Sequence, residues 1–167
     1  IEPEELIGYE PEDTPRFSYD MDELIQLICN AKKPVIVTGN GIHLSNTEKM
    51  FLELKEKLQI PIVSTWTSKD LMNFDDELFV GNFGIMGERS SVPNTGYNYN
   101  LFSPDSTKVM VDIDANELNK PTLKIDFPIN ENLNVFLSGL LSKLQDVDLP
   151  SYETWKNLTQ SWKLKYP

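Results

Sequence analysis

The sequence predicts an α/β fold, a three-layer doubly wound parallel sheet of the Rossmann-like type. Short apolar runs alternate along the chain with amphipathic segments of helical period, which is the order that parallel strands and their crossover helices require. One apolar run, at 35–38, leads directly into a glycine-containing loop and then into a further helix. With 167 residues, 40% of them hydrophobic and 25% charged, the chain is long enough for one domain with a buried core.

The first part of the chain predicts a linker, a helix and a strand. Residues 1–19 are rich in Pro, Glu and Asp and lack a sustained period, so we expect an extended linker. Ser18 or Asp20 can cap a helix whose apolar residues recur at helical spacing, and this helix must end before Pro34. The buried strand at 35–38 follows.

Further alternation of helices and strands predicts the rest of the domain. After the glycine loop we expect a helix over roughly 46–58 and a strand at 62–65. Between 81 and 109 no run is typical of a strand, and so long a loop is uncommon inside a compact domain. The remaining predicted elements are a strand at 108–114, a helix at 115–120, a strand at 123–127, a helix at 131–145 and a helical tail at 151–167.

Charge and cysteine content exclude several classes of function. The net charge of −11 and the isoelectric point near 4.5 disfavour binding to nucleic acid or to an anionic membrane surface. A single cysteine, Cys29, cannot form an internal disulfide, so we expect a cytoplasmic protein with a buried, unreactive thiol. Cys29 and the single histidine, His43, are too few ligands for a structural zinc site. We find no membrane span or signal peptide, and a chain that begins at Ile1 is expected to be a piece of a longer protein.

Four motifs follow one another along the chain: AKKPVIVTGNGIH, ELKEKLQIPIVSTWTSKD, DDELFVGNFGIMGERS and KVMVDIDANELNK. In this order they resemble the central domain of thiamine-diphosphate-dependent enzymes, most closely the acetolactate synthase-like branch. The opening IEPEELIGYEPE resembles the exit from that family's N-terminal domain, and the closing WKLKYP resembles the approach to its C-terminal domain. The resemblance implies a DHS-like NAD/FAD-binding fold at 20–150, a linker from a missing N-terminal domain at 1–19, and a helical linker towards a missing C-terminal domain at 151–167.

The sequence departs from that family after the turn Gly87-Glu88-Arg89. Family members usually continue with a helix and an apolar strand that ends in Gly-Ser-Arg, whereas here Ser91 is followed at once by Val92. About twenty residues, the length of one short helix and one strand, are absent. The missing strand would be internal to the sheet, so its neighbours would lose backbone partners on one side. The sequence leaves open whether the segment is deleted from the protein or only left out of the given chain.

The resemblance implies a parent enzyme that decarboxylates a 2-keto acid such as pyruvate on thiamine diphosphate and transfers the resulting carbanion to an acceptor. In such enzymes the cofactor lies between the N- and C-terminal domains, which supply an activating glutamate and a Gly-Asp-Gly motif for magnesium and the diphosphate. The chain has no Gly-Asp-Gly, so we expect it to contain no catalytic or metal-binding residue and to act as a scaffold. The implied partners are the two other domains, in a parent that is a homodimer or homotetramer.

Several branches of this family carry FAD or another adenine nucleotide on the central domain. Here Gly39 and Gly41 let the backbone approach a diphosphate, and a helix that starts near Ser45 directs its dipole at it. The carboxylate of Asp112 can accept ribose hydroxyls. The resemblance places Ile85 and Met86 at the family's flavin-contacting positions. The candidate nucleotide-binding residues are Gly39, Asn40, Gly41, Thr65, Trp66, Ile85, Met86, Asp112 and Ile113.

Each candidate also has a purely structural interpretation. The glycines can serve a tight turn between strand and helix, and Asp112 and Asp114 can be turn or cap residues. Trp66 and Met86 can pack in the core or against another domain, and His43 can touch a phosphate or lie on the surface. Two other functions stay open: a stand-alone nucleotide-binding regulatory module without enzymatic activity, and a structural interaction domain that binds no nucleotide.

Overall fold

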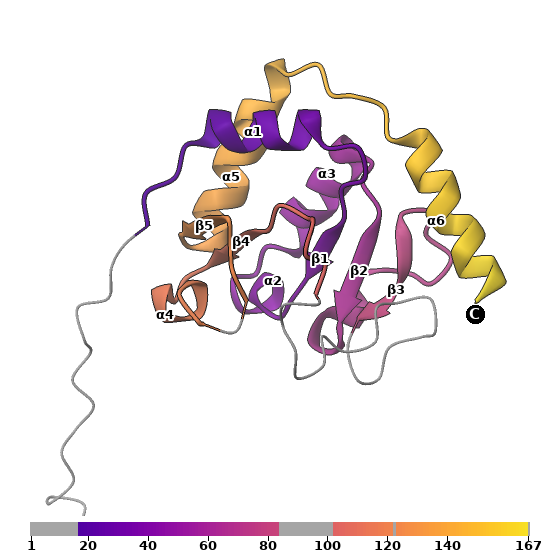
Figure 1. The fold of residues 1–167 in the computed structure, drawn as a ribbon, viewed down its shortest axis with the longest axis horizontal. Coiled ribbons are helices and arrows are strands. Elements are labelled where there is room, and N and C mark those ends of the chain that lie inside the picture. Colours follow the sequence, from indigo (N-terminus) through magenta and orange to yellow (C-terminus); the bar gives the residue numbers. More distant parts are fainter. Residues whose placement is uncertain (1–16, 84–101, 122, 167) are drawn as a thin grey trace, which may run out of the picture.

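The computed structural model describes residues 17–83, 102–121 and 123–166, and these form a mixed α/β fold with parallel strands, as predicted. In chain order the elements are α1 (Met21–Asn30), β1 (Ile36–Thr38), α2 (Gly41–Leu44), α3 (Glu48–Leu58), β2 (Ile62–Thr65), the 3-10 helix η2 (Trp66–Leu71), β3 (Phe79–Phe83), β4 (Val109–Asp112), α4 (Ala115–Leu118), β5 (Phe127–Asn130), α5 (Leu133–Lys143), the 3-10 helix η4 (Leu144–Asp146) and α6 (Glu153–Lys165). Figure 1 shows their arrangement.

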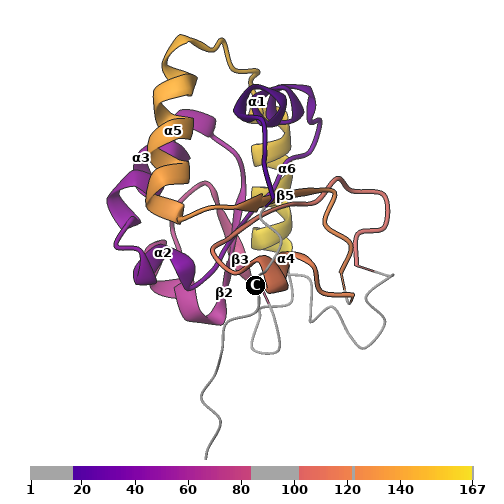
Figure 2. The same cartoon turned by 90° about the vertical axis from the view of Figure 1, so that its left-hand side faces the viewer.

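The described strands form two sheets, one in the order β1-β2-β3 and one of β4 and β5, and all pairings are parallel. Seen together, Figures 1 and 2 place α2, α3 and α5 on one side of the strands and α1 and α6 on the other. This gives the layered order that crossover connections produce in a doubly wound fold. Within the first sheet, Ile36 pairs with Ile62 and Thr38 with Ser64.

The first helix ends and begins where the sequence predicts. Asp20 is its N-cap, because its carboxylate accepts a hydrogen bond from the Asp22 N–H at 2.8 Å. The helix ends at Asn30, four residues before Pro34. Cys29, near the end of this helix, is half-buried, whereas the sequence analysis predicts a buried thiol. It packs against the edge of the larger hydrophobic cluster.

The third strand lies partly where the sequence analysis predicts a loop. β3 pairs with β2 and extends to Phe83, so the expectation of no strand after residue 81 is wrong. Phe79 pairs with Ile62 and Gly81 with Val63, so β3 has one residue more than β2 between these two pairs and the register shifts there. A bulge and a central glycine break the regular pattern from which a strand is predicted. The rest of the predicted loop, 84–101, lies outside the described residues.

The last strand is displaced from its predicted position at 123–127. β5 runs from Phe127 to Asn130 and contains Pro128, a residue that argues against a strand. The N–H of Phe127 donates to the carbonyl of Lys108 at 3.0 Å. Bonding alternates along a parallel strand, so the position of Pro128 faces away from β4, where a missing N–H costs no hydrogen bond of this pairing.

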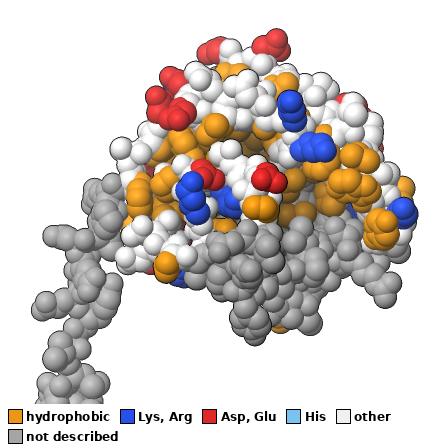
Figure 3. All heavy atoms as spheres, in the orientation of Figure 1, with side chains coloured by type: hydrophobic (Ala, Val, Ile, Leu, Met, Phe, Trp, Pro, Cys, Tyr) orange, Lys and Arg blue, Asp and Glu red, His pale blue; other side chains and the backbone are white. Residues whose placement is uncertain are grey.

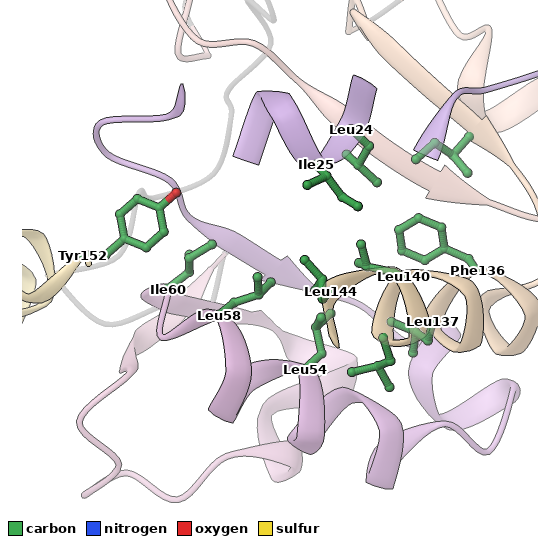
Figure 4. Close-up of a cluster of buried hydrophobic side chains, with 12 residues drawn as sticks. Leu24, Ile25, Leu54, Leu58, Ile60, Phe136, Leu137, Leu140, Leu144 and Tyr152 are labelled. Atoms are coloured by element: carbon green, nitrogen blue, oxygen red, sulfur yellow. The ribbon is translucent and has the colours of Figure 1, made fainter. Parts of the chain in front are cut away.

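The larger hydrophobic core lies between α1, α3, α5 and the strands, as Figure 4 shows. Ile129 of β5 and Leu144 after α5 are fully buried in it. A second cluster, which includes Ile42, Phe51 and Ile62, fills the space between α2, α3 and the first sheet. Both clusters follow from the helical spacing of apolar residues in the predicted helices at 46–58 and 131–145.

The predicted helical tail is present as α6, and polar side chains hold it against the sheet. Trp155 Nε1 donates to the Pro34 carbonyl at 2.8 Å, and Gln160 Nε2 donates to the Glu77 carbonyl at 2.6 Å. Lys163 is 8% exposed, donates to the Phe79 carbonyl at 2.9 Å, and has its Nζ 4.4 Å from the ring centre of Phe74. These contacts tie α6 to the start of β1 and of β3.

We expect the substitution Lys163→Met to lower the free energy of unfolding by about 2 kcal/mol, because hydrogen bonds from a charged donor to buried carbonyls contribute about 1.5–3 kcal/mol. Urea unfolding followed by circular dichroism measures this difference. The control is Lys165→Met on the same helix, where the side chain is exposed and the effect should stay within about 0.5 kcal/mol. Equal stability of the two variants would contradict the role given to Lys163.

Candidate functional site

The glycine loop lies at the carboxyl end of β1 and leads directly into α2. A Cβ atom built on Gly39 meets no atom within 4 Å, and one on Gly41 meets only Leu133 Cδ2 at 4.0 Å. Neither glycine has a positive φ, so the turn does not require glycine at either position. The space above Gly39 is therefore open to another molecule.

The helix that follows the loop differs from the prediction. A single helix from about residue 46, with its dipole directed at the loop, is expected from the sequence, but α2 ends at Leu44 and α3 begins at Glu48. Asn46, with φ of 53°, separates the two helices. A four-residue helix has a small dipole, and the carboxylate of Glu48 lies in the first turn of α3, at its positive end. The predicted helix dipole therefore does not act on the loop.

A pocket of about 150 Å³ lies where the carboxyl ends of β1 and β4 meet. Its lining includes Gly41, Asp112 and Ile113, so the structure brings together three of the predicted residues. Glu131 and Leu133, from the turn between β5 and α5, complete the opposite wall. The sequence analysis did not single out these two residues, although a turn that directly follows a parallel strand lies at the edge where such folds bind ligands.

Two carboxylates determine the electrostatics of the pocket. Asp112 Oδ1 accepts the Asp114 N–H at 2.8 Å, and Glu131 Oε1 accepts the Asn132 N–H at 2.8 Å. The structural interpretation as turn and cap residues thus holds for Asp112, and also for Asp114, which caps α4. Each carboxylate has a second oxygen that can accept a hydroxyl. With no Lys or Arg in the lining, the pocket favours a neutral, hydroxyl-bearing group over a phosphate.

The other predicted residues are not part of this pocket. Thr65 and Trp66 lie at the end of β2, and neither lines it. Trp66 is 63% exposed, so the interpretation that this side chain packs in the core is wrong. Ile85 and Met86 lie outside the described residues.

A buried cluster of hydroxyl groups lies beneath the strand ends, and the sequence analysis missed it. Thr38 Oγ1 is 3.0 Å from Ser64 Oγ and 2.9 Å from Ser68 Oγ, and Ser68 Oγ donates to the Thr38 carbonyl at 2.9 Å. At most 2% of each residue is exposed. The cluster joins β1, β2 and η2, and so fixes the start of the glycine loop. A polar residue at or next to the carboxyl end of each of two apolar strands, Thr38 in β1 and Ser64 in β2, is the signal that could have found it.

His43 connects three elements beside the glycine loop. Its Nδ1 is 3.0 Å from Glu48 Oε1 on α3, and its Nε2 is 3.1 Å from Asp70 Oδ1 on η2. Carboxylates accept hydrogen bonds, so only the doubly protonated ring donates to both. The hydrogen bond to Glu48, with a further one to Asp70, raises the pKa of His43 above its usual value. Both ring nitrogens are engaged, so the ring is a clamp between elements and has no nitrogen left for a phosphate.

The described residues contain no group of three or more His, Cys, Asp or Glu side chains placed to hold a metal ion. None of their helices is long and apolar enough to cross a membrane.

Comparison with known proteins places this architecture among thiamine enzymes. Residues 21–93 match the family model described as "Thiamine pyrophosphate enzyme, central domain". The chain is 33% identical over 138 residues to the acetolactate synthase large subunit of Lactococcus lactis, an alignment that covers 72% of this chain and 24% of that protein. It is 27% identical over 179 residues to the probable acetolactate synthase large subunit of Methanocaldococcus jannaschii, with 96% of this chain and 29% of that protein covered.

These matches confirm the resemblance stated from the sequence: the chain carries the central domain of a thiamine pyrophosphate enzyme, and it is similar to acetolactate synthase large subunits. The matched part of the chain spans 24% and 29% of the length of these two relatives. A shorter similarity, 29% over 68 residues, links 41% of the chain to a 3D-(3,5/4)-trihydroxycyclohexane-1,2-dione hydrolase of Clostridium perfringens.

The alignments also hold positions that this chain lacks. The alignment to the Methanocaldococcus protein has 179 positions but includes 96% of 167 residues, about 160, so about 19 positions have no counterpart here. The Lactococcus alignment leaves about 18 unmatched positions by the same reasoning. These lengths agree with the segment of about twenty residues predicted to be absent after Ser91.

We expect the thermal stability of the protein to fall as pH rises from about 6 to 9. The pKa of His43 is higher in the folded protein than in the unfolded chain, where it is about 6.5, so the protonated ring stabilises the fold fully below that pH. This contribution is lost as the pH rises through the pKa of the folded state. The substitution His43→Gln should flatten this dependence. His43 is the only histidine, so its titration by NMR is unambiguous.

The control for this experiment is Glu53→Gln, which removes an exposed carboxylate from α3 and should leave the slope against pH unchanged. A His43 ring that titrates at or below about 6.5 in the folded protein would contradict the clamp.

Proposed function

We propose that this chain is the central scaffold domain of a cytoplasmic thiamine-diphosphate-dependent enzyme that decarboxylates a 2-keto acid and transfers the product to an acceptor. The observation that carries this proposal is the family match over 21–93, together with similarity to acetolactate synthase large subunits over most of the chain. In this proposal thiamine diphosphate and Mg²⁺ bind to the other two domains of the parent, which is a homodimer or homotetramer.

The contribution of this domain is to hold its neighbours in a fixed orientation. A linker from the N-terminal domain leads to α1, and α6 leads towards the C-terminal domain. Hydrogen bonds from Trp155 and Gln160 tie α6 to the carbonyls of Pro34 and Glu77, so the exit of the chain is set by the sheet. A cofactor that lies between two other domains needs such a rigid spacer, because reacting groups must be placed to within a fraction of an ångström.

The full-length protein that contains this chain should consume pyruvate only when thiamine diphosphate and Mg²⁺ are both supplied. Release of CO₂ in a coupled assay measures this activity, and the isolated 167-residue chain under the same conditions is the control, for which we expect none. Pyruvate consumption without thiamine diphosphate, or by the isolated chain, would overturn the proposal.

We further propose that the pocket between β1 and β4 binds the nucleoside part of an adenine nucleotide. The support is the placement of Gly41, Asp112 and Ile113 around it, with open space above Gly39. Small-molecule pockets usually measure about 300–1,000 Å³, so this one, at about 150 Å³, can enclose only part of such a ligand. The residues fit a ribose, whose hydroxyls Asp112 and Glu131 can accept, and do not enclose a whole FAD.

Calorimetric titration of the chain with adenosine, ADP and FAD tests this site. The substitution Asp112→Asn should lower the affinity for adenosine about tenfold, because a hydrogen bond to a charged acceptor contributes about 1.5–3 kcal/mol. The amide oxygen of asparagine can still accept the Asp114 N–H, so the turn is preserved. Asp105→Asn, at an exposed position away from the pocket, is the matched control. Absence of heat with all three ligands would leave the residues as turn formers.

A further inference from the structure

The residue pair Asn40-Gly41 in the glycine loop is the only Asn-Gly pair of the sequence. Unlike the hydrophobic side chains exposed below α1 (Figure 3), which indicate no particular partner, this pair has a defined chemistry. The backbone nitrogen that follows an asparagine can attack the side-chain amide carbon, and glycine has no side chain to shield that nitrogen. In a folded protein the reaction proceeds where the amide and the nitrogen are both free to approach each other.

The side chain of Asn40 is exposed, and it makes none of the hydrogen bonds by which a capping side chain is held to its helix. Two asparagines at and after the end of β5 are instead held in place. Asn132 Oδ1 accepts the Asn134 N–H at 2.9 Å. Asn130 Nδ2 donates to the Ile113 carbonyl at 2.9 Å. The amide of Asn40 can therefore turn towards the main chain, whereas the amides of Asn130 and Asn132 are fixed.

The backbone nitrogen of Gly41 is also available. Gly41 is the first residue of α2, a position whose N–H has no partner within a helix, and no hydrogen bond joins this N–H to another backbone group of the described residues. A Cβ built on Gly41 would meet only Leu133 Cδ2, at 4.0 Å, so neighbouring side chains do not crowd the residue. The nitrogen can therefore lose its proton and attack without first breaking a hydrogen bond.

The main chain of Asn40 opposes the attack only weakly. Its angles are helical, with φ of −60° and ψ of −20°, and ring closure needs a rotation about ψ that brings the side chain and the Gly41 nitrogen to the same side. This rotation breaks one backbone hydrogen bond, from the Leu44 N–H to the Asn40 carbonyl at 3.1 Å. The helix α2 has four residues, and helices shorter than about 12 residues are marginal by themselves. The reactive conformation is therefore close in free energy to the one observed.

We propose that Asn40-Gly41 is a site of spontaneous deamidation in the folded protein. The Gly41 nitrogen loses its proton to hydroxide and attacks Asn40 Cγ, a cyclic imide forms, and the side-chain nitrogen takes up a proton from water and leaves as ammonia. Water then opens the ring at either carbonyl. One opening gives aspartate at position 40, and the other gives isoaspartate, in which the main chain runs through the former side chain. Overall, one water is consumed and one ammonia is released, without an oxidant or reductant.

Both products place a new carboxylate beside Gly41, which lines the pocket at the strand ends. Asp112 and Glu131 already make that pocket acidic, so the modification disfavours anionic ligands further. Isoaspartate also adds a methylene group to the main chain directly before α2, and the carbonyl that accepts the Leu44 N–H becomes a free carboxylate. The modification thus changes the charge and the shape of this wall, whether or not the pocket binds a nucleotide.

The experiment incubates the full 167-residue chain at mildly alkaline pH and follows its proteolytic peptides by mass spectrometry. We expect the peptide that contains Asn40 to gain about 1 Da, the difference between an NH₂ and an OH group, and to separate into two isomers by chromatography. A synthetic peptide of residues 36–44 gives the rate without the fold. The folded chain should convert within about tenfold of that rate, because one backbone hydrogen bond has to open. Asn130 and Asn132 are the internal controls and should stay unconverted.

Two variants make the result specific. Gly41→Ala should slow the conversion at least about fivefold, because its Cβ shields the nitrogen and alanine favours the helical backbone over glycine by about that factor. The open space around Gly41 accommodates the added methyl group, so this variant should fold normally. Gly39→Ala, where a Cβ meets nothing within 4 Å, is the matched control and should convert at the unchanged rate. An Asn40 that stays intact while the synthetic peptide converts would overturn the proposal. So would a gain in mass without isoaspartate, because opening of the cyclic imide gives both isomers.

Discussion

The described parts of the two sheets are held together by side-chain packing, and the rest of the fold depends on this constraint. Ile36 of β1 and Val111 of β4 pack against one cluster, whose centre includes the fully buried Ile129 and Leu144. Burial of each large apolar side chain contributes about 1.5–3 kcal/mol. Because hydrophobic packing is non-directional, it brings the sheets together without fixing their register as a hydrogen-bonded ladder does. The helix α5, which supplies four of the buried residues, therefore determines where β4 lies relative to β1.

The elements that were predicted well are those whose own residues determine them. The capping carboxylate of Asp20 and the break before Pro34 are local, and they define α1. The elements that were misplaced depend on partners distant in the sequence. Pro128 is acceptable in β5 because its position faces away from β4, the strand with which β5 pairs, and the bulge at Val80 exists only in the pairing of β3 with β2. The sequence alone does not show which strands pair, so local propensity predicted a loop in one case and a shifted strand in the other.

The candidate site shows the same division. Gly41, Asp112 and Ile113 were predicted because parallel strands place their carboxyl ends at one edge, and these residues do line one pocket. That topology does not determine the charge of the pocket. Asp112 and Glu131 make it acidic, and α2 is too short to offset them with a helix dipole. The topology therefore predicts which of these residues meet at one pocket, and it does not predict the charge around them.

The pocket at the strand ends depends on the same packing. Its lining includes Gly41, which follows β1, Asp112 at the end of β4, and Leu133 at the start of α5. Among the described residues β1 and β4 belong to different sheets, so no ladder of hydrogen bonds between these two strands fixes the distance across the pocket. The side-chain packing that positions α5 and β4 fixes it instead, so a substitution in that cluster would change the pocket without touching its lining.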